Sequence, residues 1–177
     1  MSGDKKLWAP WRIEYLRGEL SSGADDGCFL CEAGAEGLSD QERRERLILT
    51  RYRTAVVLMN RYPYTNGHLL VASVRHVGEL GDLTVAERAD LMELVAWADA
   101  LIRRAVCAQG VNIGMNIGRC AGAAVPGHLH VHVVPRWQGD VNFMETVGNA
   151  RVMPQALEAS YADLLTAKEQ AGPVGPA

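Results

Sequence analysis

Three of the five histidines of the chain stand at alternate positions in the stretch GHLHVHVVPRW, from Gly127 to Trp137. Side chains of a β-strand point alternately to its two faces, so His128, His130 and His132 would share one face there. The leucine and valines between them would face a core. A neutral imidazole can act as a nucleophile, a proton carrier or a metal ligand. A solvated or hydrogen-bonded histidine face is the alternative without chemistry, and the flanking glycine and Pro-Arg-Trp argue against it.

One metal ion bound by all three histidines is a further alternative. The ligands of a tetrahedral ion converge on one point, and a flat row of alternate residues converges only if the strand is strongly curved. We therefore expect the three imidazoles to have different roles.

Cys28 and Cys31 form a Cys-x-x-Cys pair in a polar segment. The pair supplies two of the four ligands that a structural zinc ion needs, so it is half of a metal site. Reduced thiols and a redox pair are the alternatives. Cys107 and Cys120 have no partner in the sequence, and we expect ordinary packing for both.

The composition limits the class of protein. Of the 177 residues, 48% are hydrophobic and 22% are charged, which suits one globular domain with a substantial core. The formal net charge of −3 offers no basic surface for nucleic acid, so a phosphate-bearing ligand needs a local site. No apolar run is long enough to span a membrane, and the first residues lack the apolar core of a signal peptide. We expect a cytoplasmic protein without disulfides.

Apolar runs predict five strands, and two periodic segments predict helices. Thr84 and Glu87 match a capping box, and the apolar stripe after them predicts a long helix that Gly110 ends. Pro154 is expected in the first turn of the second helix. The expected strands are residues 47–50, 55–60, 68–74, 111–117 and 128–135, and the expected helices are 84–109 and 154–170.

Links of hairpin length between consecutive strands favour a mainly antiparallel α+β sheet over a parallel α/β sheet. Residues 1–46 are expected to form an N-terminal arm that carries the Cys-x-x-Cys pair and is otherwise loop-like from residue 18. Residues 47–150 would form the core domain, and 151–177 the C-terminal helix with a frayed tail. Trp97 lies outside the apolar stripe of the long helix, where an exposed tryptophan would suit an interface.

The chain resembles the histidine triad (HIT) superfamily, which is named for the pattern His-φ-His-φ-His-φ-φ, where φ is apolar. The string GHLHVHVV from Gly127 matches this pattern. Other similar segments are NRYPYTNGHLLV from Asn60, NIGMNIG from Asn112 with Gly122 after it, LWAPWR from Leu7 and PRW from Pro135. The resemblance covers about residues 7–150. It implies a HIT-like fold, with about five antiparallel strands, one long helix and one C-terminal helix.

The resemblance also implies an activity. HIT enzymes of this type are nucleotidyl hydrolases or transferases that cleave the α-phosphate bond of dinucleoside polyphosphates such as Ap4A or Ap3A. The middle histidine, His130, would be the nucleophile and would form a nucleotidyl-histidine intermediate, with water or phosphate as the acceptor. This requires a neutral His130 whose other ring nitrogen donates to an acceptor such as a backbone carbonyl. A nucleoside phosphoramidase and a non-catalytic nucleotide-binding module are the alternatives.

Several further residues acquire expected roles from their positions in the family. His132 would contact the phosphate, and His68 would support the triad through hydrogen bonds. Asn60 would meet the ribose hydroxyls, although a turn asparagine at a strand end is an equal reading of that residue. Relatives often place a hydroxyl residue just before the triad, but this chain offers only backbone N–H groups there. The other residues expected to bind nucleotide or phosphate are Asn116, Gly122, Ala123, Ala124 and Trp137.

Some HIT and galactose-1-phosphate uridylyltransferase relatives hold zinc on a Cys-x-x-Cys, a histidine after the second strand and the first triad histidine. The resemblance therefore implies a structural zinc ion held by Cys28, Cys31, His76 and His128, which leaves His130 free to react. It implies no organic cofactor, a nucleotide ligand carried as a Mg²⁺ complex, and a homodimer formed through the long helix and an adjacent strand. Base preference, acceptor, physiological substrate and the role of the Trp8–Trp11 arm stay open.

Overall fold

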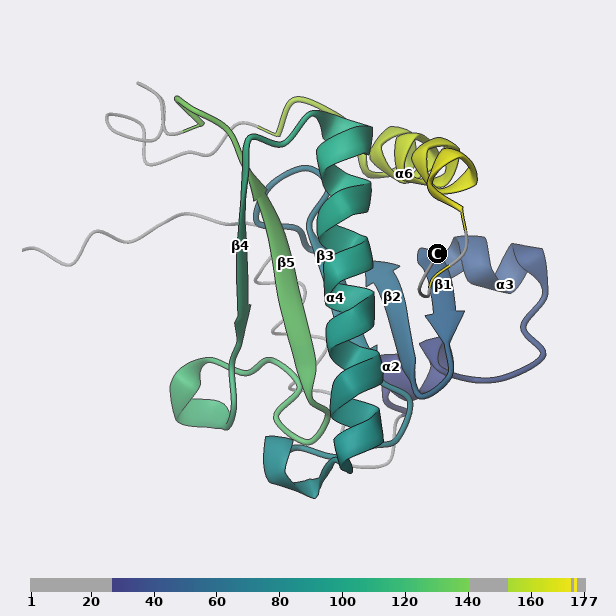
Figure 1. Cartoon of the computed structure of the whole chain (residues 1–177), viewed down its shortest axis with the longest axis vertical. Coiled ribbons are helices and arrows are strands. Elements are labelled where there is room, and N and C mark those ends of the chain that lie inside the picture. Colours follow the sequence, from purple (N-terminus) through teal and green to yellow (C-terminus); the bar gives the residue numbers. More distant parts are fainter. Residues whose placement is uncertain (1–26, 141–152, 173, 175–177) are drawn as a thin grey trace, which may run out of the picture.

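One antiparallel sheet organises the molecule. The computed structural model describes residues 27–140, 153–172 and 174. The strands are β1 (Ile48–Tyr52), β2 (Ala55–Met59), β3 (Leu69–Ser73), β4 (Gly110–Met115) and β5 (His130–Arg136). They lie in the order β1-β2-β3-β5-β4, and every neighbouring pair is antiparallel (Figure 1). The expected antiparallel α+β sheet of five strands is confirmed.

Helices cover both faces of the sheet. The long helix α4 (Val85–Val106) runs across one face (Figure 1). The short helix α2 (Phe29–Ala33) packs on the other face, where Leu30 and Ala33 are fully buried. As a result β2 and β3 are buried throughout, which explains why their sequences, AVVLM and LLVAS, do not alternate between apolar and polar residues.

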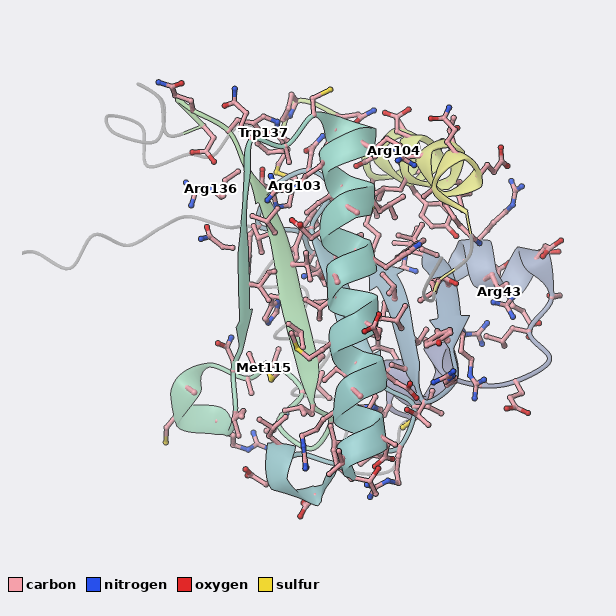
Figure 2. All side chains as sticks on the ribbon, in the orientation of Figure 1. Arg43, Arg103, Arg104, Met115, Arg136 and Trp137 are labelled. Atoms are coloured by element: carbon pink, nitrogen blue, oxygen red, sulfur yellow. The ribbon has the colours of Figure 1, made fainter. Side chains whose placement is uncertain are left out.

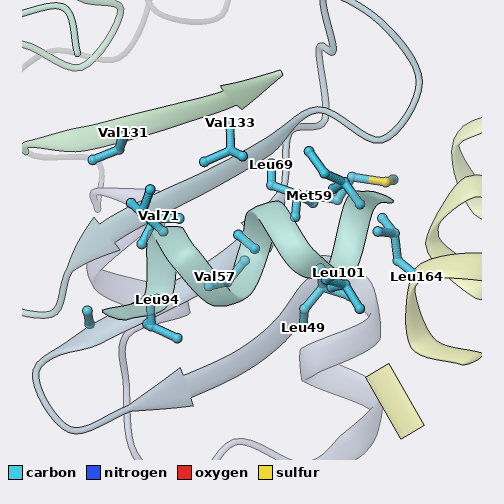
Figure 3. Packing of buried hydrophobic residues seen from close by; sticks show 14 of the residues in the cluster. Leu49, Val57, Met59, Leu69, Val71, Leu94, Leu101, Val131, Val133 and Leu164 are labelled. Carbon is cyan, nitrogen blue, oxygen red and sulfur yellow. The ribbon is translucent and has the colours of Figure 1, made fainter. Parts of the chain in front are cut away.

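Alternation along the strands decides which side of the sheet holds the core and which holds the histidines. The α4 face carries the larger cluster of buried side chains (Figure 3), which includes Val57, Met59, Leu69, Val71, Leu94, Leu101, Val131 and Val133. The residues between these in sequence face α2: Val56, Leu58, Leu70 and Ala72. Because Val131 and Val133 are anchored against α4, His130 and His132 must lie on the opposite face.

The long helix begins as predicted and ends earlier than predicted. The Thr84 hydroxyl accepts from the Glu87 amide, and the Glu87 carboxylate accepts from the Thr84 amide at 2.7 Å, so the capping box is confirmed. The helix ends at Val106, and Cys107 takes a left-handed conformation with φ of 51°. Gly110 therefore does not end the helix but begins β4. The carbonyl of Val106, at the last turn of the helix, accepts from the indole N–H of Trp137 at 3.0 Å. This long-range contact leaves no pattern in the local sequence.

Other predicted boundaries need correction. The last helix, α6 (Leu157–Ala171), begins three residues after Pro154, with Ala156 at its N-cap. Helix α3 (Asp40–Glu45) lies in a segment that we expected to be loop-like. Its Ser39 and Glu42 form a capping box, a signal that was present in the sequence but had no apolar run after it.

Three surface expectations also change. Cys107 and Cys120 are exposed, so the expected packing of both is wrong. Trp97 is half-buried against the α4 core rather than exposed. Among the described residues, no helix is both long enough and apolar enough to cross a bilayer.

Candidate active site and metal centre

A chain of hydrogen bonds runs through two histidines on the face opposite α4. The backbone N–H of Tyr64 donates to Nδ1 of His68 at 3.1 Å, and the Asn60 amide lies 3.2 Å from the same nitrogen. A backbone N–H can only donate, so Nδ1 of His68 has no proton and Nε2 has one. Nε2 of His68 lies 3.0 Å from Nδ1 of His132 and donates to it. The proton of neutral His132 is therefore on Nε2, the ring nitrogen that this chain leaves unbonded.

The proton position in His130 follows from the same argument. Nδ1 of His130 lies 2.9 Å from the backbone carbonyl of His128. A carbonyl oxygen only accepts, so Nδ1 carries the proton and Nε2 keeps a lone pair. The rings of His130 and His132 lie edge to face, with centroids 5.0 Å apart. The site thus pairs an unprotonated ring nitrogen on His130 with a protonated one on His132.

Burial keeps these imidazoles neutral. Desolvation, with smaller contributions from His132 and His130, lowers the pKa of His68 to about 3. Desolvation, followed by the effect of His130, lowers the pKa of His132 to about 4. The pKa of His130 is also lowered by burial, although its bond to the His128 carbonyl opposes that shift. All three rings are therefore neutral at neutral pH, as nucleophilic attack by His130 requires.

We expect the stability of the fold to fall as the pH drops below 6.5. The unfolded chain takes up a proton on residue 68 near pH 6.5, whereas folded His68 resists it down to about pH 3. Between pH 6.5 and 5, His68 alone should lower the free energy of unfolding by about 2 kcal/mol. Urea unfolding of wild type and His68→Gln at pH 7 and pH 5 isolates this contribution. An equal loss of stability in both proteins would contradict it.

A second cluster of side chains lies next to the histidine row. Nδ1 of His128 lies 3.3 Å from the sulfur of Cys28 and 3.4 Å from that of Cys31, and Nδ1 of His76 lies 3.1 Å from the sulfur of Cys31. The four ligand atoms lie within 4.8 Å of one another. The structure therefore brings together the four residues that we expected to hold zinc. Cys28 is the N-cap of α2 and Cys31 lies within it, His76 lies in the segment after β3, and His128 lies two residues before β5.

The chemistry of this donor set suits zinc. Two sulfurs and two imidazole nitrogens form a common structural zinc site. Nε2 of His128 lies 2.6 Å from the Ser73 carbonyl and donates to it, which leaves the Nδ1 lone pair directed at the sulfurs. Without a cation, burial and then the neighbouring Cys28 raise the pKa of Cys31 to about 11. A bound cation would favour the thiolate and offset this repulsion.

His128 does not belong to the strand that the sequence predicted. Strand β5 begins at His130, so His128 and Leu129 lie just before the strand rather than in it. The ring of His76 packs closely against Gly127, since a Cβ at Gly127 would lie 3.1 Å from Nε2 of His76 and the ring would have to shift slightly. Leu129 still packs in the α4-side core with Val131 and Val133, and His128 contacts the cysteines on the α2 side, so the shared face that we expected for the three histidines holds although the strand stops short of His128. The ring of His128 lies fully buried in the metal cluster.

The segment between β4 and β5 offers the side-chain amide of Asn116 to the site. Met115 pairs with Val131, and one further step of this register places Asn116 opposite His130. No hydrogen bond joins the half-buried Asn116 side chain to another described residue. Gly122 has a φ of +85°, and its N–H donates to the Arg119 carbonyl. The N–H of Ala123 donates to Gly118 at 3.3 Å, so the backbone donor that we expected at residue 123 is already in use.

Two other expected binding residues have partners of their own. Trp137 lies beyond the far end of β5 from His130, with its indole bound to Val106, and Figure 2 shows it at the opposite end of the sheet from Met115. The structure does not bring it to the histidines within one chain. Oδ1 of Asn60 accepts from the Tyr62 amide, and Nδ2 points to His68. Asn60 thus takes the turn-asparagine role and also joins the hydrogen-bond chain.

Comparison with known proteins identifies the family. The HIT domain model matches residues 41–139, more than half of the chain. The chain belongs to the HIT family. A curated AP-4-A phosphorylase of Mycobacterium tuberculosis is 39% identical to this HIT protein over 158 residues, which cover 86% of this chain and 78% of the relative. The asymmetrical bis(5'-nucleosyl)-tetraphosphatase of Schizosaccharomyces pombe is 37% identical over 93 residues, which cover 52% of this chain and 50% of that one.

One solved structure with a similar fold is that of a zinc-bound protein. A Zn-bound histidine triad family protein from Mycobacterium smegmatis matches this HIT protein with a TM-score of 0.59 and 27% identity. The match covers 81% of this chain and 94% of that chain. The metal in that structure is zinc, which the donor set found here also favours.

Sequence reasoning missed two contributors to the site. The ring of Tyr64 stacks on His132 at a centroid distance of 5.6 Å and lies 4.7 Å from His68. The carbonyl of Ser73 orients His128. The sequence around Tyr64 indicated only a turn, so it gave no signal for this contact. A backbone carbonyl leaves no signal in a sequence.

Proposed function

We propose that this HIT protein cleaves dinucleoside polyphosphates of the Ap4A type through a nucleotidyl group held on His130. The observation that carries the proposal is the bond from Nδ1 of His130 to the His128 carbonyl, because it fixes the lone pair on Nε2. Nε2 would attack the α-phosphorus and form a P–N bond, while the P–O bond to the rest of the polyphosphate breaks. The Nε2–H group of His132 would donate a hydrogen bond to a non-bridging oxygen of the phosphate, where negative charge develops.

The second step regenerates the enzyme. An acceptor oxygen attacks the phosphorus and loses its proton to solvent, the P–N bond breaks, and its electron pair returns to Nε2 of His130. With Ap4A, the first step releases ATP. Water as the acceptor then gives AMP, and phosphate gives ADP. The similarity to AP-4-A phosphorylase along most of the chain favours phosphate as the acceptor, whereas the alanines at 123 and 124 favour water.

Product analysis with Ap4A tests this proposal. If phosphate is the acceptor, ATP and ADP should form only when inorganic phosphate is present. If water is the acceptor, AMP and ATP should form without phosphate. A chain that releases neither pair of products under either condition would contradict the proposed activity.

We propose that the metal cluster supports the catalytic row through His128. Cys28, Cys31, His76 and His128 would hold a zinc ion, which would supply structural cross-linking rather than reaction chemistry. The His128 ring would be fixed on one side by the metal and on the other by Ser73. The carbonyl of the same residue accepts from His130. The four ligands would thus hold the group that sets the proton position of His130.

We also propose a homodimer that uses α4 and β4. β4 is at the end of the sheet order, so one of its edges has no partner strand among the described residues. Ile113 on β4 is 50% exposed, and Met92 on α4 is 54% exposed. Exposed apolar side chains on an unpaired edge are typical of an interface.

Light scattering at micromolar concentration tests the dimer. The wild type should have twice the chain mass of 19.3 kDa, and Ile113→Lys should shift the mass towards the monomer. Leu80→Lys is the control, because Leu80 is an exposed apolar residue outside α4 and β4. A monomeric wild type would rule out the dimer, and a dimeric Ile113→Lys would exclude β4 from the interface.

A further inference from the structure

A cavity of about 190 Å³ lies on the α4 side of the sheet, away from the histidines. It opens between the turn that joins β2 to β3 and the first turn of α6, and its walls include Met59, Arg61, Asn66, Leu157 and Ser160. Met59 belongs to the α4 core, whereas His130 and His132 lie on the opposite face. The cavity is therefore separate from the catalytic row, although Asn66 is only two residues from His68. Its volume is several times what one water molecule needs.

Two buried polar atoms at this cavity have no hydrogen-bond partner. Ser160 is 3% exposed and Asn66 is 7% exposed, and neither the Ser160 hydroxyl nor Oδ1 of Asn66 is bonded. The amide nitrogen of Asn66 makes only long contacts to Gln155, of 3.4 and 3.5 Å. Buried polar atoms are normally paired, because each unpaired one destabilises the fold. A ligand that accepts from Ser160 and donates to Asn66 would satisfy both.

The surroundings favour a negative charge. Arg61 lines the cavity, and its guanidinium bonds the Glu45 backbone carbonyl and has no salt bridge to a described carboxylate. The N-cap of α6, Ala156, has no side chain that can accept from the first-turn N–H groups, so the positive end of the helix dipole is uncapped. Two acidic residues oppose this charge. Glu158 in the first turn is exposed, and Asp163 accepts from Gln155 at 2.6 Å.

We propose that this cavity, which we name the α6 pocket, binds inorganic phosphate as hydrogen phosphate. The dianion keeps one O–H, which would donate to Oδ1 of Asn66. Its other oxygens would accept from the Ser160 hydroxyl and from Arg61. The apolar walls of Met59 and Leu157 would strengthen these bonds by excluding water. Sulfate and the dianion of a phosphate monoester have the same charge but no O–H, so the Asn66 oxygen would reject them.

Binding of small anions to the full-length protein tests this proposal. At pH 8 we would titrate inorganic phosphate, sulfate and methyl phosphate and follow the NMR signals of the Asn66 side-chain amide and the Ser160 backbone amide. Phosphate should shift both signals to saturation, with an affinity at least about tenfold higher than that for sulfate or methyl phosphate. Methyl phosphate binding as well as phosphate would assign the pocket to phosphate esters instead.

Two variants show whether the pocket residues carry the binding. Ser160→Ala should weaken phosphate binding at these signals by about tenfold, and alanine suits this helical position. Thr166→Ala is the matched control, because that hydroxyl is also on α6 but donates to the Ala162 carbonyl outside the pocket. Unchanged signals on phosphate addition would mean that the cavity holds water only and would overturn the proposal. The same holds if Ser160→Ala binds phosphate like the wild type. These signals report on the α6 pocket without turnover, so failure here would leave the function proposed for His130 untouched.

Discussion

Replacing His130 with alanine should lower the rate of Ap4A cleavage by about 10⁴-fold or more. The variant has no ring nitrogen that can form the P–N bond, so the reaction can no longer be divided into two displacements. The other ring positions should remain, because the His68 to His132 chain does not pass through His130. Nucleotide affinity should therefore change only a few-fold. Steady-state kinetics and calorimetric titration of a non-hydrolysable nucleotide measure the two effects separately.

Val134→Ala is the matched control for this variant. Val134 lies on β5, two residues beyond His132, on the same face and half-buried. It should keep activity within a few-fold of the wild type. A His130→Ala protein that turns over Ap4A like the wild type would show that the proposed mechanism is wrong. A wild type that binds nucleotide but does not turn over any substrate of this class would identify a binding module instead.

Loss of the metal should lower both stability and activity. Replacing Cys28 with serine removes a ligand of the four-residue cluster, and the expected loss of about 3–5 kcal/mol corresponds to a fall in Tm of about 10 °C or more. The Ap4A cleavage rate of Cys28→Ser should be about 10- to 100-fold lower than that of the wild type, because the carbonyl of His128 would no longer be held in place for His130. Thermal unfolding measures the loss of stability, steady-state kinetics with Ap4A measure the loss of activity, and zinc content with the ¹⁵N shift of the His128 ring nitrogens measures the loss of the metal.

Cys120→Ser is the control for the metal prediction. Cys120 is exposed and lies outside the cluster, so this change should leave zinc content and Tm unaltered. Protein purified without chelator that contains no stoichiometric zinc would contradict the metal site. A full zinc content in Cys28→Ser with an unchanged Tm would exclude Cys28 as a ligand.

The sequence predicted the fold well because apolar patterns encode burial. The runs AVVLM and LLVAS have no alternation since helices cover both of their faces, and the valines of β5 alternate with histidines since only one face there is core. The placement of His128 beside the cysteines, apart from His130 and His132, could also be predicted, through the resemblance of GHLHVHVV and the Cys-x-x-Cys pair to a known family. Patterns of this kind indicate which residues are together but not how their protons are placed.

The errors arose where tertiary contacts decide the local structure. The end of α4 is set by Val106 and Trp137, which are far apart in the chain. Strand β5 begins at His130 rather than at His128, which contacts the Ser73 carbonyl and the two cysteines from distant parts of the chain. Helix α3 has a cap but no buried residue, so its sequence lacks the apolar period on which the prediction relied. The predictions for the Trp8–Trp11 arm and the frayed tail fall almost entirely outside the described residues.

Because the two faces of the sheet differ, substitutions along β5 should have two distinct effects on protein abundance and on activity in a systematic mutational scan. The sheet separates two environments, a packed hydrocarbon layer under α4 and a hydrogen-bonded layer of imidazoles on the other side. Substitutions at Val131 and Val133 should reduce the amount of folded protein, whereas those at His130 and His132 should give folded protein with little activity. Abundance and turnover, plotted along this strand, should therefore rise and fall with a period of two residues and in opposite phase.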